Sequence, residues 1–144
     1  MQQKYYLIIS LLAVILINGC IKQIQQEETI ITSLNNSFKL KIDQVAIIEG
    51  ESIKIKFLNI TEDSRCPSDV VCVWEGQTTV IVNIMKDNKN LGIFTLTSRS
   101  GHPDLAIKNF DRYSIRLIKV EPYPKTTQKI ETSHYVITLN VSKL

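Results

Sequence analysis

Apolar and polar residues alternate along most of the chain after residue 36, with the period of strands that bury one face. Segment 37–43, SFKLKID, and segment 52–57, SIKIKF, both alternate apolar residues with lysines, and Glu49-Gly50-Glu51 is expected to form the turn between them. Segment 102–110 is expected to hold at most one short helical turn. Further strands are predicted at 79–85, 91–97, 113–120 and 134–141.

These six or seven strands predict an all-β domain over residues 37–144. The connections between them are too short for parallel crossovers, so the strands are expected to be mostly antiparallel. A chain of this size either closes into a small antiparallel barrel of the oligonucleotide/oligosaccharide-binding type or forms a two-sheet, immunoglobulin-like sandwich. The barrel is the preferred prediction and the sandwich is the alternative.

The first twenty residues have the pattern of an export signal. Lys4 precedes an apolar run over 7–17, which is too short to cross about 30 Å of hydrocarbon as a transmembrane helix. The sequence Leu16-Ile17-Asn18-Gly19-Cys20 resembles the lipobox of bacterial lipoproteins, whose cysteine carries diacylglycerol and becomes the N-terminus after cleavage. We therefore expect residues 1–19 to be a signal peptide and Cys20 to anchor the protein to a membrane through its lipid. The expected location is the bacterial cell envelope, at the outer membrane if the host has one.

Residues 20–36 are rich in Gln, Glu and Asn and predict a flexible, lipid-anchored tether. Loss of the signal peptide removes Lys4 and no acidic residue, so the formal net charge falls from +3 to +2. The remaining lysines are scattered among acidic residues, and no basic run is interleaved with aromatic residues. This pattern argues against a nucleic-acid partner.

Segment 62–77, EDSRCPSDVVCVWEGQ, holds the other two cysteines and the only tryptophan of the chain. Because Cys20 is expected to be lipidated, Cys66 and Cys72 remain as a pair in an oxidising compartment and are expected to form a disulfide. So small a ring contributes only about 2 kcal/mol in the chain-entropy model. Its larger effect is local rigidity, which lowers the entropic cost of binding a partner. The predicted partner-binding residues are Asp63, Ser64, Arg65, Pro67, Ser68 and Asp69.

The same segment has a purely architectural interpretation. In it the bridge only pins the end of a strand, and Trp74 packs over the bridge as a core aromatic residue. Both interpretations are compatible with the residue pattern.

No residues of the chain have the spacing of a catalytic or metal site. His102 and His134 are the only histidines and lie far apart in the sequence. Ser100-Gly101-His102-Pro103-Asp104 contains Ser, His and Asp, but neighbours within one turn cannot take up the geometry of a catalytic triad. We therefore expect a protein that is not an enzyme and that uses no cofactor and no metal ion.

Three stretches carry a resemblance to known proteins. Segment 63–82, DSRCPSDVVCVWEGQTTVIV, is followed by LIKVEPYP at 117–124 and HYVITLNV at 134–141. This order resembles a group of small bacterial lipoproteins that includes the potempins, lipid-anchored inhibitors of secreted proteases, some with a barrel similar to that of tissue inhibitors of metalloproteinases. Glu75 stands where a small residue is more usual in the group. The residues that match are Asp63, Ser64, Arg65, Cys66, Pro67, Cys72, Trp74 and Gly76.

Two functions follow as hypotheses. In the first, loop 63–69 binds a protein partner, either a secreted protease or another envelope protein. Arg65 then fills the pocket of a serine protease that is specific for basic residues, or an oxygen of Asp63, Ser64 or Asp69 binds a catalytic zinc ion. In the second, the protein is a structural or accessory envelope lipoprotein and the loop is only architecture. Exposure separates the two, because a recognition loop has to protrude.

Overall fold

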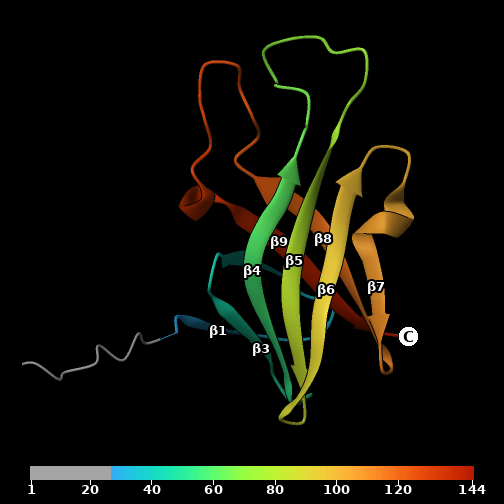
Figure 1. Cartoon of the computed structure of the whole chain (residues 1–144). Coiled ribbons are helices and arrows are strands. Elements are labelled where there is room, and N and C mark those ends of the chain that lie inside the picture. The colour runs from blue at the N-terminus through green and yellow to red at the C-terminus, as the bar shows by residue number, and fades with distance from the viewer. Residues whose placement is uncertain (1–26) are drawn as a thin grey trace, which may run out of the picture.

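The computed structural model describes residues 27–144, which form two β-sheets packed face to face (Figure 1). The larger sheet has the strand order β1-β3-β4-β5-β6, and the smaller sheet has the order β2-β9-β8-β7. Every strand pair is antiparallel except β1 with β3, which is parallel. The elements are β1 Thr29–Thr32, β2 Ser37–Lys41, β3 Val45–Ile48, β4 Ile53–Asp63, β5 Gln77–Lys86, β6 Lys89–Arg99, the 3-10 helix η1 Pro103–Ala106, β7 Ile107–Phe110, β8 Tyr113–Glu121, the 3-10 helix η2 Thr132–His134 and β9 Val136–Lys143.

The prediction of an all-β, mostly antiparallel domain is confirmed, whereas the preferred barrel is wrong. No strand ladder joins the two sheets within the described residues, so they do not close on themselves. The two-sheet sandwich, predicted as the alternative, fits the structure. The physical reason is that the sheets meet through their apolar faces, while β6 packs against β7 and β8 without pairing with them.

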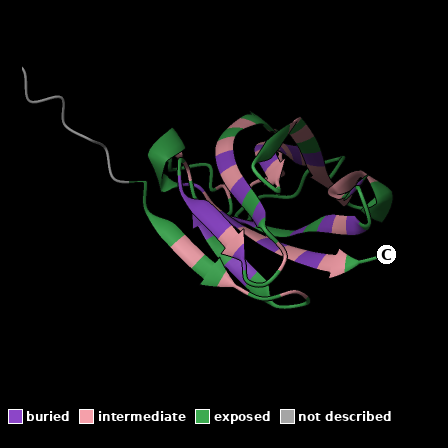
Figure 2. Cartoon of the chain, turned by 90° about the horizontal axis from the view of Figure 1, so that it is seen from below, coloured by how far each residue is buried: buried purple, intermediate pink, exposed green. Residues whose placement is uncertain are grey.

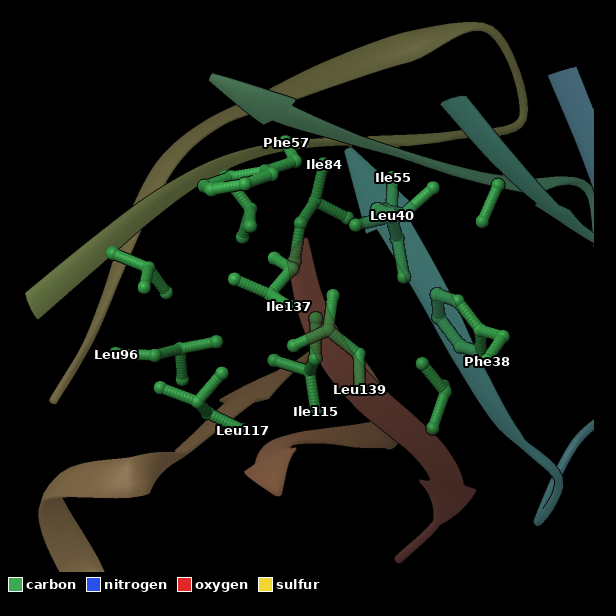
Figure 3. Close-up of a cluster of buried hydrophobic side chains, with 14 of the residues drawn as sticks. Phe38, Leu40, Ile55, Phe57, Ile84, Leu96, Ile115, Leu117, Ile137 and Leu139 are labelled. Atoms are coloured by element: carbon green, nitrogen blue, oxygen red, sulfur yellow. The ribbon is translucent and has the colours of Figure 1, made fainter. Parts of the chain in front are cut away.

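The core lies between the two sheets and follows the alternation of the sequence. On β5, and on β4 as far as Phe57, every second residue turns inward, and Figure 2 shows bands of buried and exposed positions along the strands. Apolar side chains of β2, β4, β5, β8 and β9 meet between the sheets (Figure 3). The buried residues of these strands include Phe38, Leu40, Ile53, Ile55, Phe57, Val80, Val82, Ile84, Ile115, Leu117, Ile137, Leu139 and Val141.

Three strands lie where no strand was expected. β7 falls inside segment 102–110, where only a short helical turn was predicted, and η1 forms that turn directly before it. β1 falls inside segment 20–36, which was predicted as a tether, and pairs with β3. β3 itself lies between the two strands that Glu49-Gly50-Glu51 was expected to connect. The predicted signal peptide and the predicted tether up to residue 26, with Cys20, lie outside the described part of the chain. From residue 27 on, no helix is long and apolar enough to cross a membrane.

Three loops project from the same end of the sandwich (Figure 1). They are the connection from β4 to β5, the connection from β6 to η1 and the connection from β8 to β9. The first is segment 64–76, which contains both described cysteines. We call it the bridged loop.

Candidate functional site

The bridged loop is closed by a disulfide between Cys66 and Cys72, whose Cα atoms are 5.9 Å apart. This confirms the pairing predicted from the sequence. Next to the bridge, the N–H of Cys66 donates to the carbonyl of Glu75 at 3.0 Å, and the N–H of Ser64 donates to the carbonyl of Gln77 at 2.8 Å. The two ends of the loop are therefore tied to each other both covalently and by backbone hydrogen bonds.

The base of the bridged loop is held by a buried ion pair. A guanidinium nitrogen of Arg65 lies 2.6 Å from a carboxylate oxygen of Asp63, and the two side chains are only 8% and 10% exposed. The Arg65 guanidinium also donates to the carbonyls of Val120 at 2.7 Å and Pro122 at 3.0 Å. The hydroxyl of Tyr135 donates to Asp63 at 2.9 Å. Asp63 at the end of β4, Val120 on β8 and Tyr135 directly before β9 thus meet around Arg65. This cluster links the two sheets.

The contacts of this cluster shift the pKa values of Asp63 and Tyr135. Burial raises the pKa of the Asp63 carboxyl, but hydrogen bonds from Arg65 and Tyr135 and the charge of Arg65 outweigh burial and bring the pKa below its usual value. Burial and the hydrogen bond to Asp63 raise the pKa of the Tyr135 phenol to about 12. Asp63 is therefore ionised and Tyr135 neutral at physiological pH, which is the pairing that the hydrogen bonds require.

A second set of contacts ties the bridged loop to the connection from β8 to β9. The backbone N–H of Ser68 donates to the carbonyl of Pro124 at 3.0 Å. The backbone N–H of Thr126 donates to the Asp69 carboxylate at 3.0 Å, and the Thr126 hydroxyl donates to the same group. These hydrogen bonds lower the pKa of the Asp69 carboxyl below its usual value. The two loops consequently form one continuous surface.

Arg65 was expected to present its side chain to a partner, and the structure corrects this expectation. Its guanidinium is turned inward, where it contacts Asp63 and two carbonyls and lies 4.9 Å from the ring centre of Tyr123. Four hydrogen bonds join the guanidinium to these acceptors. If Arg65 turned outward, the Asp63 carboxylate would lose its cation. Arg65 positions the bridged loop and does not lie on its outer surface.

The other predicted loop residues are brought together, but most of them serve the loop itself. Asp63 is buried in the ion pair, and the Ser64 hydroxyl donates to Glu62 at 2.9 Å. Ser68 and Asp69 are exposed and are engaged by the neighbouring loop. Pro67 is half-buried beside the bridge.

The tip of the bridged loop is apolar and faces solvent. Val71 and Val73 are fully exposed, and Trp74 is 80% exposed. This contradicts the architectural interpretation of Trp74 as a core aromatic packed over the bridge. Val70 is 46% exposed, so the four apolar residues that flank Cys72 in the sequence all face solvent. We call Val70, Val71, Val73 and Trp74 the apolar tip.

An open groove lies beside the apolar tip. It has a volume of about 540 Å³ and separates the bridged loop from the connection between β6 and η1. Trp74 and Glu75 line one side, and Arg99 and His102 line the other. From residue 27 onward, no group of His, Cys, Asp and Glu side chains is arranged to hold a metal ion.

Of the residues predicted for partner binding, Asp63 and Arg65 are turned inward, and the most exposed side chains of the loop belong to residues outside that set. The apolar tip could have been recognised in the sequence from segment 70–74, VVCVW, an apolar run of five residues that lies outside the alternating segments. Comparisons of the chain with protein-family models, with curated proteins and with solved structures found no match.

Proposed function

We propose that this domain binds a protein partner through the apolar tip of the bridged loop. The observation that carries the proposal is the full exposure of Val71 and Val73, next to an 80% exposed Trp74, on a loop that is held at both ends. Several neighbouring apolar residues are rarely left exposed on a domain that acts alone, and their exposure supports an interaction site here.

The construction of the loop favours tight binding by few residues. The disulfide, the Asp63–Arg65 ion pair and the hydrogen bonds from Ser68 to the neighbouring loop fix the backbone before a partner arrives. Little conformational entropy is then lost on binding. Tryptophan is also the residue type that most often dominates interface energy, because it buries a large area with few rotatable bonds.

A secreted protease is one class of partner that this surface suits. An inhibitor holds a rigid, protruding segment in the cleft of the enzyme, and the bridged loop has that form (Figure 1). With Arg65 turned inward, the side chain offered to a specificity pocket is Val73 or Trp74. The proposed target is therefore a protease that prefers apolar residues, in place of the protease specific for basic residues that the sequence suggested.

The proposed location is the bacterial cell envelope, with the protein anchored through a lipid on Cys20. Support comes from the Leu16-Ile17-Asn18-Gly19-Cys20 motif and from the disulfide, which persists in oxidising compartments. Mass spectrometry of the mature protein is expected to show an acylated Cys20 at the N-terminus, and Cys20→Ala is expected to abolish the modification. An unmodified N-terminus at another residue, in the native host, would refute the anchor.

The proposed interaction is tested with the chain from Ile21 to Leu144, which retains the nine strands found in residues 27–144. It is used as bait against the secreted and envelope proteins of the host, with a photo-crosslinker at residue 73 to identify a direct contact. Val73→Asp and Trp74→Asp are each expected to weaken binding to the identified partner at least tenfold, or more than about 1.4 kcal/mol, because each places a charge in an apolar contact.

The control is Ile93→Asp, which changes a 65% exposed residue on β6, far from the loop in the sequence and outside the apolar tip. It is expected to leave binding unchanged. Equal binding by wild type and both loop variants would leave the domain with the alternative function, that of a structural or accessory envelope protein. If the crosslinked partner is a protease, inhibition is measured directly with an apolar substrate.

A further inference from the structure

The outer edge of β1 carries unpaired backbone groups. β1 is the last strand of the larger sheet, and no described strand pairs with its outer side (Figure 1). On its inner side the carbonyl of Thr32 accepts a hydrogen bond from the N–H of Glu49 at 2.8 Å. Successive residues of a paired strand direct their backbone groups to opposite sides. The N–H and C=O groups of Thr29 and Ile31 therefore point away from β3.

β1 lacks the protection that the other edge strands have. Proteins commonly block sheet edges with charged side chains, above all lysine. β2 carries Lys39 and Lys41, β7 carries Lys108, and β6 begins with Lys89, ends with Arg99 and is covered by β7, β8 and η1. β1, with the sequence TIIT, is the one edge strand of the described chain that has no charged residue.

The side chains of β1 are suited to a further strand beside it. Ile31 is 72% exposed on the outer face of the sheet. Ile30 is half-buried and packs against the core from the other face. Figure 2 shows this alternation of exposed and half-buried positions along β1. An added strand would cover Ile31 on one face and complete the burial of Ile30 on the other.

We propose that β1 pairs in antiparallel fashion with β1 of a second copy of this chain, about a two-fold axis at Ile30. In this register Thr29 lies opposite Ile31 of the second copy, and the two residues exchange both of their N–H to C=O hydrogen bonds. The two-fold axis generates the same pair a second time, with Ile31 opposite Thr29 of the second copy. The two pairs together form four hydrogen bonds from the backbone groups of Thr29 and Ile31 that point away from β3. Two five-stranded sheets become one continuous sheet.

The contacts across this edge favour a second copy as the occupant. Ile31 lies beside Thr29 of the second copy on the outer face, a pair of β-branched residues that suits a strand. Ile30 meets Ile30 of the second copy at the axis, where the two apolar cores join. Glu28 lies opposite Thr32, so no like charges face each other. The pairing is independent of the bridged loop and of its proposed function.

The dimer is expected to be weak in solution. Four residues of strand bury much less than the roughly 1,600 Å² of a standard interface, so we expect a dissociation constant on the order of 100 μM. Sedimentation velocity of the chain from Ile21 to Leu144, between about 10 μM and 1 mM, is expected to show a reversible shift from monomer to dimer. A chain that stays monomeric at 1 mM, or that grows beyond the dimer, overturns the proposal.

Variants locate the contact. Ile31→Lys places a charge on the open edge and is expected to weaken dimerisation at least tenfold, whereas Ile93→Lys, a change at an exposed isoleucine of β6, is expected to leave it unchanged. Equal dimerisation by wild type and Ile31→Lys contradicts the proposal. Thermal unfolding of both variants verifies that each is folded.

A cysteine at the two-fold axis tests the register. In a pair of this type the two Cα atoms at position 30 lie about 4.5 Å apart, which is within reach of a disulfide. Ile30→Cys is expected to form covalent dimers under mild oxidation, and Lys39→Cys, on the edge of the other sheet, is expected to stay monomeric. A dimer in which position 30 does not crosslink overturns the proposed pairing.

Discussion

Replacing Gly76 by alanine is expected to destabilise the domain by about 3 kcal/mol or more. Gly76 ends the bridged loop with a φ of +70°, a conformation that costs a residue with a side chain about 1 to 2 kcal/mol. An added Cβ would also lie only 1.8 Å from the carbonyl oxygen of Ser64 and 2.6 Å from its carbonyl carbon. Both atoms belong to the backbone on the other side of the loop, so neither moves without disturbing the ladder between β4 and β5.

Gly50→Ala is the matched control for this prediction. Gly50 has a similar φ of +77°, but nothing lies within 4 Å of the position that its Cβ would take. It should therefore show only the conformational cost, about 1 to 2 kcal/mol. The measurement is the free energy of unfolding from urea titration of both variants. Equal losses at the two positions would show that the close approach of Gly76 to Ser64 contributes nothing.

Arg65→Ala is expected to cost about 3 kcal/mol of folding stability, because it leaves the buried Asp63 carboxylate without its cation. The carbonyls of Val120 and Pro122 lose a charged donor as well. Asp63 keeps the hydrogen bond from Tyr135, which places the expected loss at the lower end of the range for broken buried ion pairs. The measurement is again urea unfolding, with partner binding measured on the folded fraction.

Two further variants make the result specific. Lys39→Ala breaks the ion pair with Glu121, whose nitrogen and oxygen are 2.9 Å apart, but the lysine is 65% exposed, so a loss below about 1 kcal/mol is expected. The double variant Asp63→Ala, Arg65→Ala should cost less than the sum of the two single changes, since it leaves no unpaired charge. An Arg65→Ala variant with unchanged stability and lost binding would instead restore Arg65 as a recognition residue.

The strands that were predicted correctly are the long ones, in which apolar and polar residues alternate often enough for the pattern to be recognised. β5 and β9 each alternate through eight or more residues, so their buried faces were correctly predicted. β1, TIIT, β3, VAII, and β7, IKNF, have four residues each and no regular alternation of apolar with polar residues, and all three were missed. Periodicity shows which face of a strand is buried, but it does not show whether the edge strands of a sheet pair with each other. The choice between a barrel and a sandwich therefore could not be made from the sequence.

The disulfide could be predicted and the direction of Arg65 could not. The pairing of Cys66 with Cys72 follows from cysteine chemistry and the number of thiols available. The position of the Arg65 side chain depends on the carbonyl of Val120, which is fifty-five residues further along the chain, and no local pattern contains that information. Trp74 was misplaced because an aromatic residue was taken as core from its type alone, although large apolar residues are also common at binding surfaces.

The position of the disulfide decides what a single proteolytic cut in the bridged loop would do to the molecule. Residues 67–71, with the exposed Val70 and Val71, lie inside the ring that Cys66 and Cys72 close. A protease that cuts there severs one peptide bond, but the two fragments stay joined through sulfur. Ser68 and Asp69 on one fragment remain hydrogen-bonded to Pro124 and Thr126. A molecule cut on either side of Val70 is therefore expected to keep its fold and its apolar tip, because the bridge prevents one cleavage in the ring from releasing the loop.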